Sequence, residues 1–257
     1  MQRKTLTRFS LGSLVGLLMM QAGLYAQGRG GRGGGAAAPA NAKAGAVIDL
    51  TGTWVSVITE DWRYRMVTPS LGDFQGVPMS AEARKVANGW DPDKEEASGD
   101  VCKSYAAPAL LRVPGRLRIS WQDDQTLKME SDAGKQSRVF HFGDWKPAAG
   151  TPPTLQGDST AEWVRGGGRG ATDGSLKVTT SNLRAGFLRK NGVPFSEKTT
   201  LTEYFDMIKE PNGDPLIVVT IVTTDPVYLT QPFVVTSQYK KEASDAKWNP
   251  TACSAKW

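Results

Sequence analysis

Apolar and polar residues alternate with a period of two along most of the chain beyond residue 110. Leu117, Ile119 and Trp121 are each followed by a polar neighbour, and the same holds for Leu127 and Met129. Short polar stretches at 123–125 and 132–135 separate these runs. Because successive side chains on a strand point to opposite faces, the pattern predicts antiparallel strands joined by hairpins.

The same alternation predicts more strands further along the chain, at 137–142, 159–165, 175–183, 199–208, 216–223 and 233–240. The strand at 216–223 is apolar at almost every position, which indicates that both of its faces are covered. The glycine run at 166–170 is predicted to be a hairpin tip. It lacks the lysine, and the serine or threonine after it, that a phosphate-binding loop requires.

Residues 49–57 are predicted to form the first strand, with Trp54 as a buried plug at one end of a barrel. Gly52 would let another chain segment come close to that strand. One helix is expected at 80–89, where Ser80 is the N-cap and Gly89 marks the end. About nine or ten strands with one short helix indicate a mainly β fold, either an antiparallel up-and-down barrel or a strongly curved sandwich.

The first 45 residues differ in composition from the rest of the chain. Three basic residues precede an apolar run at 11–24, so residues 1–26 are predicted to be a signal peptide cleaved after Ala26. The alternative, an uncleaved membrane anchor, would require a longer apolar run. Residues 27–45 are predicted to be a disordered Gly/Ala/Arg-rich linker, and residues 46–257 one folded domain. No membrane span is expected after signal cleavage, and the predicted location is periplasmic or secreted.

The formal net charge of +5 comes from the first 45 residues, which hold six basic and no acidic residues. Without them, 25 basic and 26 acidic residues remain, a formal charge of −1. A nearly neutral domain argues against nucleic acid as a partner. The oligomeric state is not indicated by any pattern.

Cys102 and Cys253 are the only cysteines. In an oxidising compartment an isolated pair is typical of one disulfide, which here would tie the C-terminal tail to an early loop. The alternative is two unrelated thiols. Two cysteines alone cannot complete a zinc site.

His141 is the only histidine, which excludes multi-histidine metal sites, and neither a metal nor a cofactor is expected. His141 shares a predicted strand face with Val139. One interpretation turns it inward as a base or hydrogen-bond donor, and the alternative is a structural histidine.

Glu203 shares a predicted face with Leu201, Phe205 and Met207. A carboxylate among apolar neighbours must be paired or must have a raised pKa, and either state suits an acid or base in a cavity. The alternatives are an ion pair with a core arginine such as Arg138, or a bulge that turns Glu203 to solvent.

Two loop segments carry further candidates. Residues 60–65, Glu-Asp-Trp-Arg-Tyr-Arg, could form a rim that orients a ligand by charge and stacking, or could simply form solvated ion pairs. Asp225, before Pro226, is predicted to redirect the chain in a turn. The alternative is that its carboxylate faces the mouth of the barrel.

Gly52-Thr53-Trp54 at the first strand, followed by hairpins, resembles the opening motif of lipocalin and wider calycin barrels. From about Asp49 to Cys253 the chain also resembles a group of exported bacterial proteins of unknown function. The positions that carry this resemblance are 49–54, 60–63, 90–92, 102, 113–115, 138, 141, 157–163, 191–196, 203–204 and 225–228. Related proteins often carry histidine where this chain has Asp158, so the chemistry of that histidine is not expected here. The resemblance implies an exported lipocalin-like barrel and no particular reaction.

Three functions are compatible with these patterns. The first is a binding protein that holds a small apolar or amphipathic ligand inside the barrel, with Trp163 and Phe205 as walls and Arg138, His141 and Glu203 as polar anchors. The second is a cofactor-independent enzyme that uses Glu203 and His141 as acid and base. The third is a cell-envelope structural or interaction protein with a solidly packed barrel.

Overall fold

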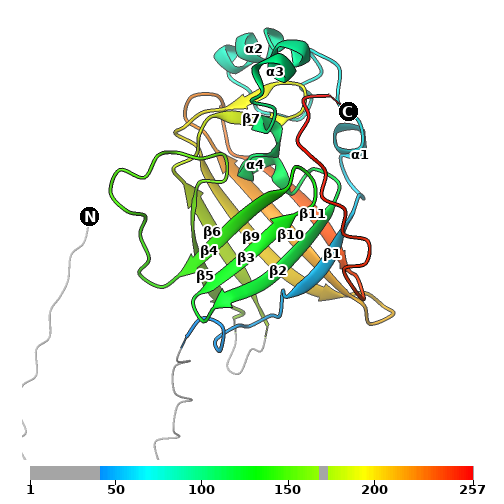
Figure 1. Cartoon of the computed structure of the whole chain (residues 1–257), viewed down its shortest axis with the longest axis vertical. Coiled ribbons are helices and arrows are strands. Elements are labelled where there is room, and N and C mark those ends of the chain that lie inside the picture. The colour runs from blue at the N-terminus through cyan, green and yellow to red at the C-terminus, as the bar shows by residue number, and fades with distance from the viewer. Residues whose placement is uncertain (1–40, 168–172, 257) are drawn as a thin grey trace, which may run out of the picture. The chain divides into compact units, whose positions relative to one another are not determined.

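The computed structural model describes residues 41–167 and 173–256. Within them, nine strands close into a barrel in the order β1-β11-β10-β9-β6-β5-β4-β3-β2 (Figure 1). The barrel strands are β1 Gly52–Val57, β2 Arg116–Asp123, β3 Thr126–Ser131, β4 Gln136–Phe142, β5 Asp158–Arg165, β6 Gly174–Ser181, β9 Thr200–Lys209, β10 Pro215–Thr224 and β11 Phe233–Lys241. The mainly β, closed-barrel prediction is confirmed.

The barrel departs from an up-and-down meander at one pair of strands. β4 and β5 run parallel, with Phe140 opposite Ser159, because the proline-rich connection at 143–157 carries the chain back to the end where β4 began. All other barrel neighbours are antiparallel. β6 and β9 are neighbours in space although a separate two-stranded sheet, β7 Gly186–Arg189 with β8 Val193–Phe195, lies between them in sequence. The fully antiparallel prediction is therefore corrected.

Short helices gather with β7 at one end of the barrel, which we call the capped end (Figure 1). The predicted helix is present as α2, Ala81–Asn88, with Ser80 accepting a hydrogen bond from the Ala83 amide. The sequence prediction of a single helix is wrong, because four further short helical segments occur: α1 Trp62–Arg65, α3 Pro92–Ser98, η1 Lys103–Tyr105 and α4 Ala107–Leu110. None is long enough for a clear period of 3.6, which is why the pattern missed them.

At the opposite end of the barrel, residues 41–45 lie against the strands although the sequence places them in a disordered linker. The Trp163 indole donates to the carbonyl of Ala42 at 2.8 Å, and the amide of Lys43 donates to the carbonyl of Asp124 at 3.1 Å. The folded part thus begins no later than Asn41. The predicted signal peptide, the linker as far as residue 40 and most of the tip of the 166–170 hairpin lie outside the described residues.

Trp54 is fully buried, and its indole donates to the carbonyl of Leu50 at 2.9 Å, as a structural plug would. Gly52 has φ +112, and a β-carbon there would lie 3.1 Å from Lys241 Cε. The position therefore favours glycine both by conformation and by space.

Cys102 and Cys253 form a disulfide with a Cα–Cα distance of 5.1 Å, which joins the C-terminal tail to the capped end. Such bonds are typical of proteins that fold in oxidising compartments. No helix in the described ranges is long and apolar enough to cross a membrane.

Candidate functional site

Four of the five residues predicted from sequence to form a site face the barrel interior. Arg138 and Glu203 are fully buried and paired through two hydrogen bonds, at 2.8 Å (Nη1 to Oε1) and 2.6 Å (Nη2 to Oε2). Arg138 Nη2 also donates to Thr180 Oγ1 at 3.0 Å. The ion pair that the sequence left as an alternative for Glu203 is thus present.

The barrel interior around this pair is filled. Phe205 is buried with its ring 6.0 Å from that of Phe140, and the neighbouring interior positions Leu176, Val178 and Leu201 have no accessible surface. A side chain that lined a water-sized cavity would show accessible surface. Trp163 packs with Trp121 and Phe142 near the end that Ala42 covers. This conformation leaves no room beside Glu203 for a ligand, so the expectation of a ligand inside the barrel is not supported.

His141 lies on the other side of the barrel wall from Glu203. Residues 138, 140 and 142 of β4 are buried, whereas His141 is half-exposed and its ring stacks on that of Trp145 at 3.8 Å between centroids. Partial burial lowers the pKa of His141, while Asp123 and Asp158 act in the opposite sense. Of the two interpretations of His141, the inward orientation is wrong, because His141 and Arg138 are three residues apart on the strand and therefore point to opposite faces. The structure does not bring the proposed acid and base together.

A different cluster of charged side chains is built at the capped end. α1 positions Tyr64 and Arg65, the turn after α4 positions Arg112, and the end of β7 positions Arg189 and Lys190. A left-handed Asp61, with φ 51, precedes α1 and turns the chain toward Arg112. Three segments that are distant in sequence thus meet at one place.

The arginines of this cluster are buried far more than arginine usually is. The side chains of Arg65 and Arg112 are 0% and 5% exposed, and Arg189 is 4% exposed. Arg65 pairs with Glu60 at 3.1 Å, and Arg112 pairs with Asp61 at 2.9 Å. These two carboxylates belong to the segment at 60–65, for which the sequence left open a rim that orients a ligand or a set of ion pairs. The ion pairs are present, and their arginines, Arg65 and Arg112, line a cavity.

Arg189 differs from its neighbours because no carboxylate in the described ranges forms an ion pair with it. Its Nη1 donates to the carbonyl of Gln75 at 2.7 Å, and its guanidinium lies 4.2 Å from the ring centroid of Tyr64. Burial and the charge of Arg112 lower the pKa of Arg189 to about 10. Asp61, Tyr64 and Asp73 act in the opposite direction. A buried cation that forms no ion pair with these carboxylates is costly to hold.

Each of the three arginines also keeps one buried nitrogen without a hydrogen-bond partner: Arg65 Nη2, Arg112 Nη1 and Arg189 Nε. Buried polar groups are nearly always paired, so three unpaired donors in one cluster require an explanation. Together with the charge of Arg189, which forms no ion pair with a carboxylate in the described ranges, they make the cluster complementary to an anion.

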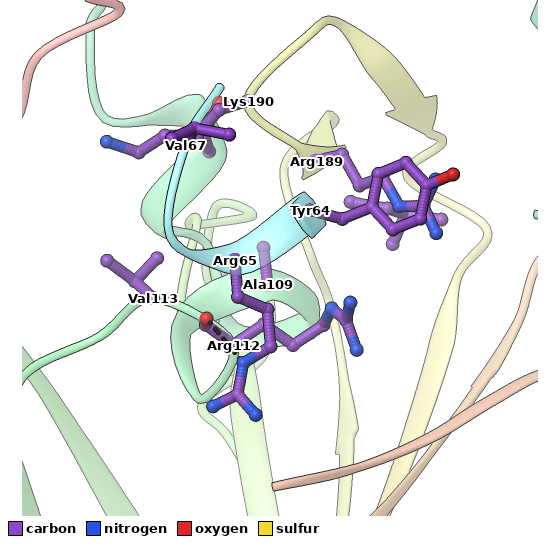
Figure 2. Close-up of a pocket in the computed structure, with 10 residues that line it drawn as sticks. Tyr64, Arg65, Val67, Ala109, Arg112, Val113, Arg189 and Lys190 are labelled. Carbon is purple, nitrogen blue, oxygen red and sulfur yellow. Dashed lines mark hydrogen bonds between the residues drawn. The ribbon is translucent and has the colours of Figure 1, made fainter. Parts of the chain in front are cut away.

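A small cavity of ≈ 20 Å³ lies among these residues and is lined by Tyr64, Arg65, Val67, Ser104, Ala109, Arg112, Val113, Leu188, Arg189 and Lys190 (Figure 2). We call it the arginine niche. It has room for about one water-sized group, the size of a carboxylate or phosphate oxygen. Tyr64 and Arg189 also line an outer hollow of ≈ 490 Å³ on the barrel rim, beside Asp61 and Phe233. The niche can therefore receive the polar end of a molecule that stays partly outside.

Sequence reasoning found the rim segment but missed Arg112, Arg189 and Lys190. Arg189 and Lys190 are adjacent basic residues, which usually indicates solvent exposure. Only the folded structure, in which both residues lie at the capped end, shows that they are buried. Asp225, the other loop candidate, is buried and accepts hydrogen bonds from Ser196, Thr199, Val227 and Tyr228, which confirms its predicted role in a turn.

Comparisons of the chain with protein-family models, with curated proteins and with solved structures found no match. In the described ranges, no group of three or more His, Cys, Asp or Glu side chains is placed to hold a metal ion. The geometry of the cluster is therefore the basis for a functional proposal.

Proposed function

We propose that this protein is an exported binding protein that takes the oxyanion end of a small molecule, a carboxylate or phosphate, into the arginine niche. The observation that carries the proposal is Arg189, whose buried guanidinium forms no ion pair with a carboxylate in the described ranges and whose Nε has no hydrogen-bond partner, in a residue that lines the cavity. Arginine suits this role because its planar guanidinium binds oxyanions through two donors at once.

Export is supported by the predicted signal peptide and by the disulfide. The disulfide closes a long loop and holds the tail against the capped end, and such bonds are typical of proteins that fold in an oxidising compartment. The barrel itself is the feature that is compatible with a calycin-like protein. The binding site proposed here lies at the capped end, however, and not in the barrel interior as the sequence suggested. The filled interior and its buried ion pair support that change of place.

Calorimetric titration of the mature protein with acetate and with inorganic phosphate tests the proposal. We expect one of the two anions to bind and to raise the melting temperature, since a ligand that binds only the folded state stabilises it. Replacing Arg189 with Met should weaken binding about 10- to 100-fold, the usual cost of losing a hydrogen bond to a charged group. Arg189→Lys, which keeps the charge, should lose less.

Arg118→Met is the matched control. Arg118 is also an arginine beside an aromatic ring, at 4.2 Å from Trp248, but it lies on the outer surface and pairs with Asp245 at 2.5 Å. Its replacement should leave anion affinity unchanged. If neither anion binds, or if Arg118→Met weakens binding as much as Arg189→Met does, the proposal is wrong. The filled barrel would then favour the alternative of a cell-envelope structural or interaction protein.

A further inference from the structure

An apolar groove begins where the arginine niche opens. Its lining residues are Met66, Val67, Thr68, Trp90, Pro92, Ala255 and Lys256, around a volume of ≈ 640 Å³. Val67 lines the niche as well, so the two spaces lie next to each other and share this residue as a wall. Figure 2 shows Val67 and Lys190 on one side of the niche and Tyr64 with Arg189 on the other.

The walls of this groove are held in place by specific contacts. The Trp90 indole donates to Glu95 Oε2 at 2.6 Å. Gly192, with φ +80, lies so close to Trp90 that a β-carbon would come within 2.3 Å of it. On the opposite wall, Glu96 Oε1 accepts hydrogen bonds from the Ser254 hydroxyl and the Ala255 amide. The disulfide at Cys253 fixes the same tail. A preorganised groove binds a chain with little ordering cost.

Apolar side chains in the groove remain open to solvent. Met66 is 51% exposed and Val67 56% exposed, although both adjoin a cluster that buries three arginines. A ligand chain that covers them would remove apolar surface from water, which is favourable in proportion to the area covered. The outer hollow on the other side of Tyr64 has a more mixed lining, in which Asp61, Arg63 and Gln75 lie beside Phe233, Val234 and Val235. Of these three apolar residues, Val234 is exposed, at 56%, and Phe233 is buried.

From the niche and the groove together we infer that the ligand is a free, single-chain amphiphilic carboxylate. Its carboxylate would enter the arginine niche and its hydrocarbon chain would lie along the groove between Met66 and Trp90. The inference rests on the proposed function, to which it adds the chemical class of the ligand and the direction of its chain.

A titration series of acetate, hexanoate, octanoate and decanoate below their micellar concentrations tests the inference. We expect affinity to rise about two- to fourfold per methylene while the chain stays in the groove. Met66→Asn should flatten this dependence without weakening acetate, because Met66 lines the groove but not the niche. Leu71→Asn is the matched control, since Leu71 is equally exposed, at 55%, and lines neither space.

The outcomes separate the inference from the proposal beneath it. Acetate binding that needs Arg189, with no dependence on chain length, would overturn the inference and leave the proposed function intact. Affinities for acetate and decanoate that are both unchanged in Arg189→Met would overturn both, because the ligands would then bind without contact between their carboxylate and Arg189. Binding to vesicles of phosphatidylglycerol but not to monomeric decanoate would overturn the inference in favour of a membrane lipid. Equal effects of Met66→Asn and Leu71→Asn would also overturn it.

Discussion

Replacing Glu203 with Gln should destabilise the protein strongly, because it leaves Arg138 as an unpaired charge inside the barrel. Both side chains are 0% exposed, and Glu203 supplies both of the carboxylate oxygens that Arg138 binds, at 2.8 and 2.6 Å. Thr180 Oγ1 would be the one remaining partner of the guanidinium, since Arg138 Nε already has none. Breaking such a pair costs ~3–5 kcal/mol, against a total stability of ~5–15 kcal/mol for a domain.

Removing both partners should have the opposite outcome. In Arg138→Met/Glu203→Leu, apolar side chains of similar volume would meet Phe140, Phe205 and the aliphatic interior around them. Replacing a buried ion pair by well-packed apolar residues is often neutral or stabilising by ~1–4 kcal/mol. The double variant should therefore be at least as stable as the original protein, and the double-mutant cycle should show a coupling of several kcal/mol.

Urea denaturation followed by circular dichroism measures these free energies of unfolding. Glu162→Gln is the control, because Glu162 pairs with Lys177 at 2.7 Å on the outer surface, where the loss of an ion pair changes stability little. A Glu203→Gln variant within about 1 kcal/mol of the original protein would refute the reasoning. So would a double variant as unstable as the single one, because the destabilisation would then come from packing and not from charge.

Three further predictions concern stability. Cys102→Ser/Cys253→Ser should lower the free energy of unfolding by up to about 5 kcal/mol, the chain-entropy value for a loop of 151 residues, as measured by denaturation beside the reduced original protein. Burial alone would raise the pKa of Asp225, but hydrogen bonds from Ser196, Val227 and Tyr228 prevail and lower it. This carboxylate therefore contributes stability above its unfolded pKa of about 4. That stability is lost as pH falls through the folded pKa, so Asp225→Asn should be less stable at pH 7 and should flatten the acid side of a stability–pH profile. Gly192→Ala should cost ~1–3 kcal/mol and shift the tryptophan emission, because its β-carbon would overlap Trp90 and φ is +80; an unchanged emission maximum would contradict this.

The strands of the barrel wall could be predicted from sequence because, in each of them, apolar side chains that face the interior alternate with side chains that face outward. The expected strand at 216–223 is observed as Pro215–Thr224, and that at 233–240 as Phe233–Lys241. Alternation is a local property, so residue types alone reveal it. The parallel pairing of β4 with β5 could not be found this way, since it depends on where the connection at 143–157 crosses the barrel end. Alternation also shows which residues share a face but not which face is inside, and for this reason the pattern leaves the orientation of His141 open.

The candidate site was harder to predict because its segments are short and irregular. Residues 60–65 stood out by their density of charge and aromatic rings, and they do border the niche. Arg112 and Arg189 lie 77 positions apart and look like ordinary surface residues in the sequence. Their burial results from the way α1, α4 and β7 meet at the capped end, a tertiary arrangement with no local signal.

A comparison of two buried arginines, Arg138 and Arg189, shows why burial alone does not indicate function. Arg138 has its carboxylate within the fold, so its charge is compensated whether or not a ligand is present. Arg189 is nearly as buried, yet within the described ranges it contacts a carbonyl and the rings of Tyr64 and Phe233 and forms no ion pair with a carboxylate. Asp61 and Asp73 act on it only through longer-range electrostatic attraction. The free-energy cost of burying that charge would be offset only when an anion binds beside it. Arg189→Met should accordingly weaken anion binding about 10- to 100-fold while leaving the unliganded protein as stable as before or more so. Loss of both stability and binding would instead mean that Arg189 is a structural residue.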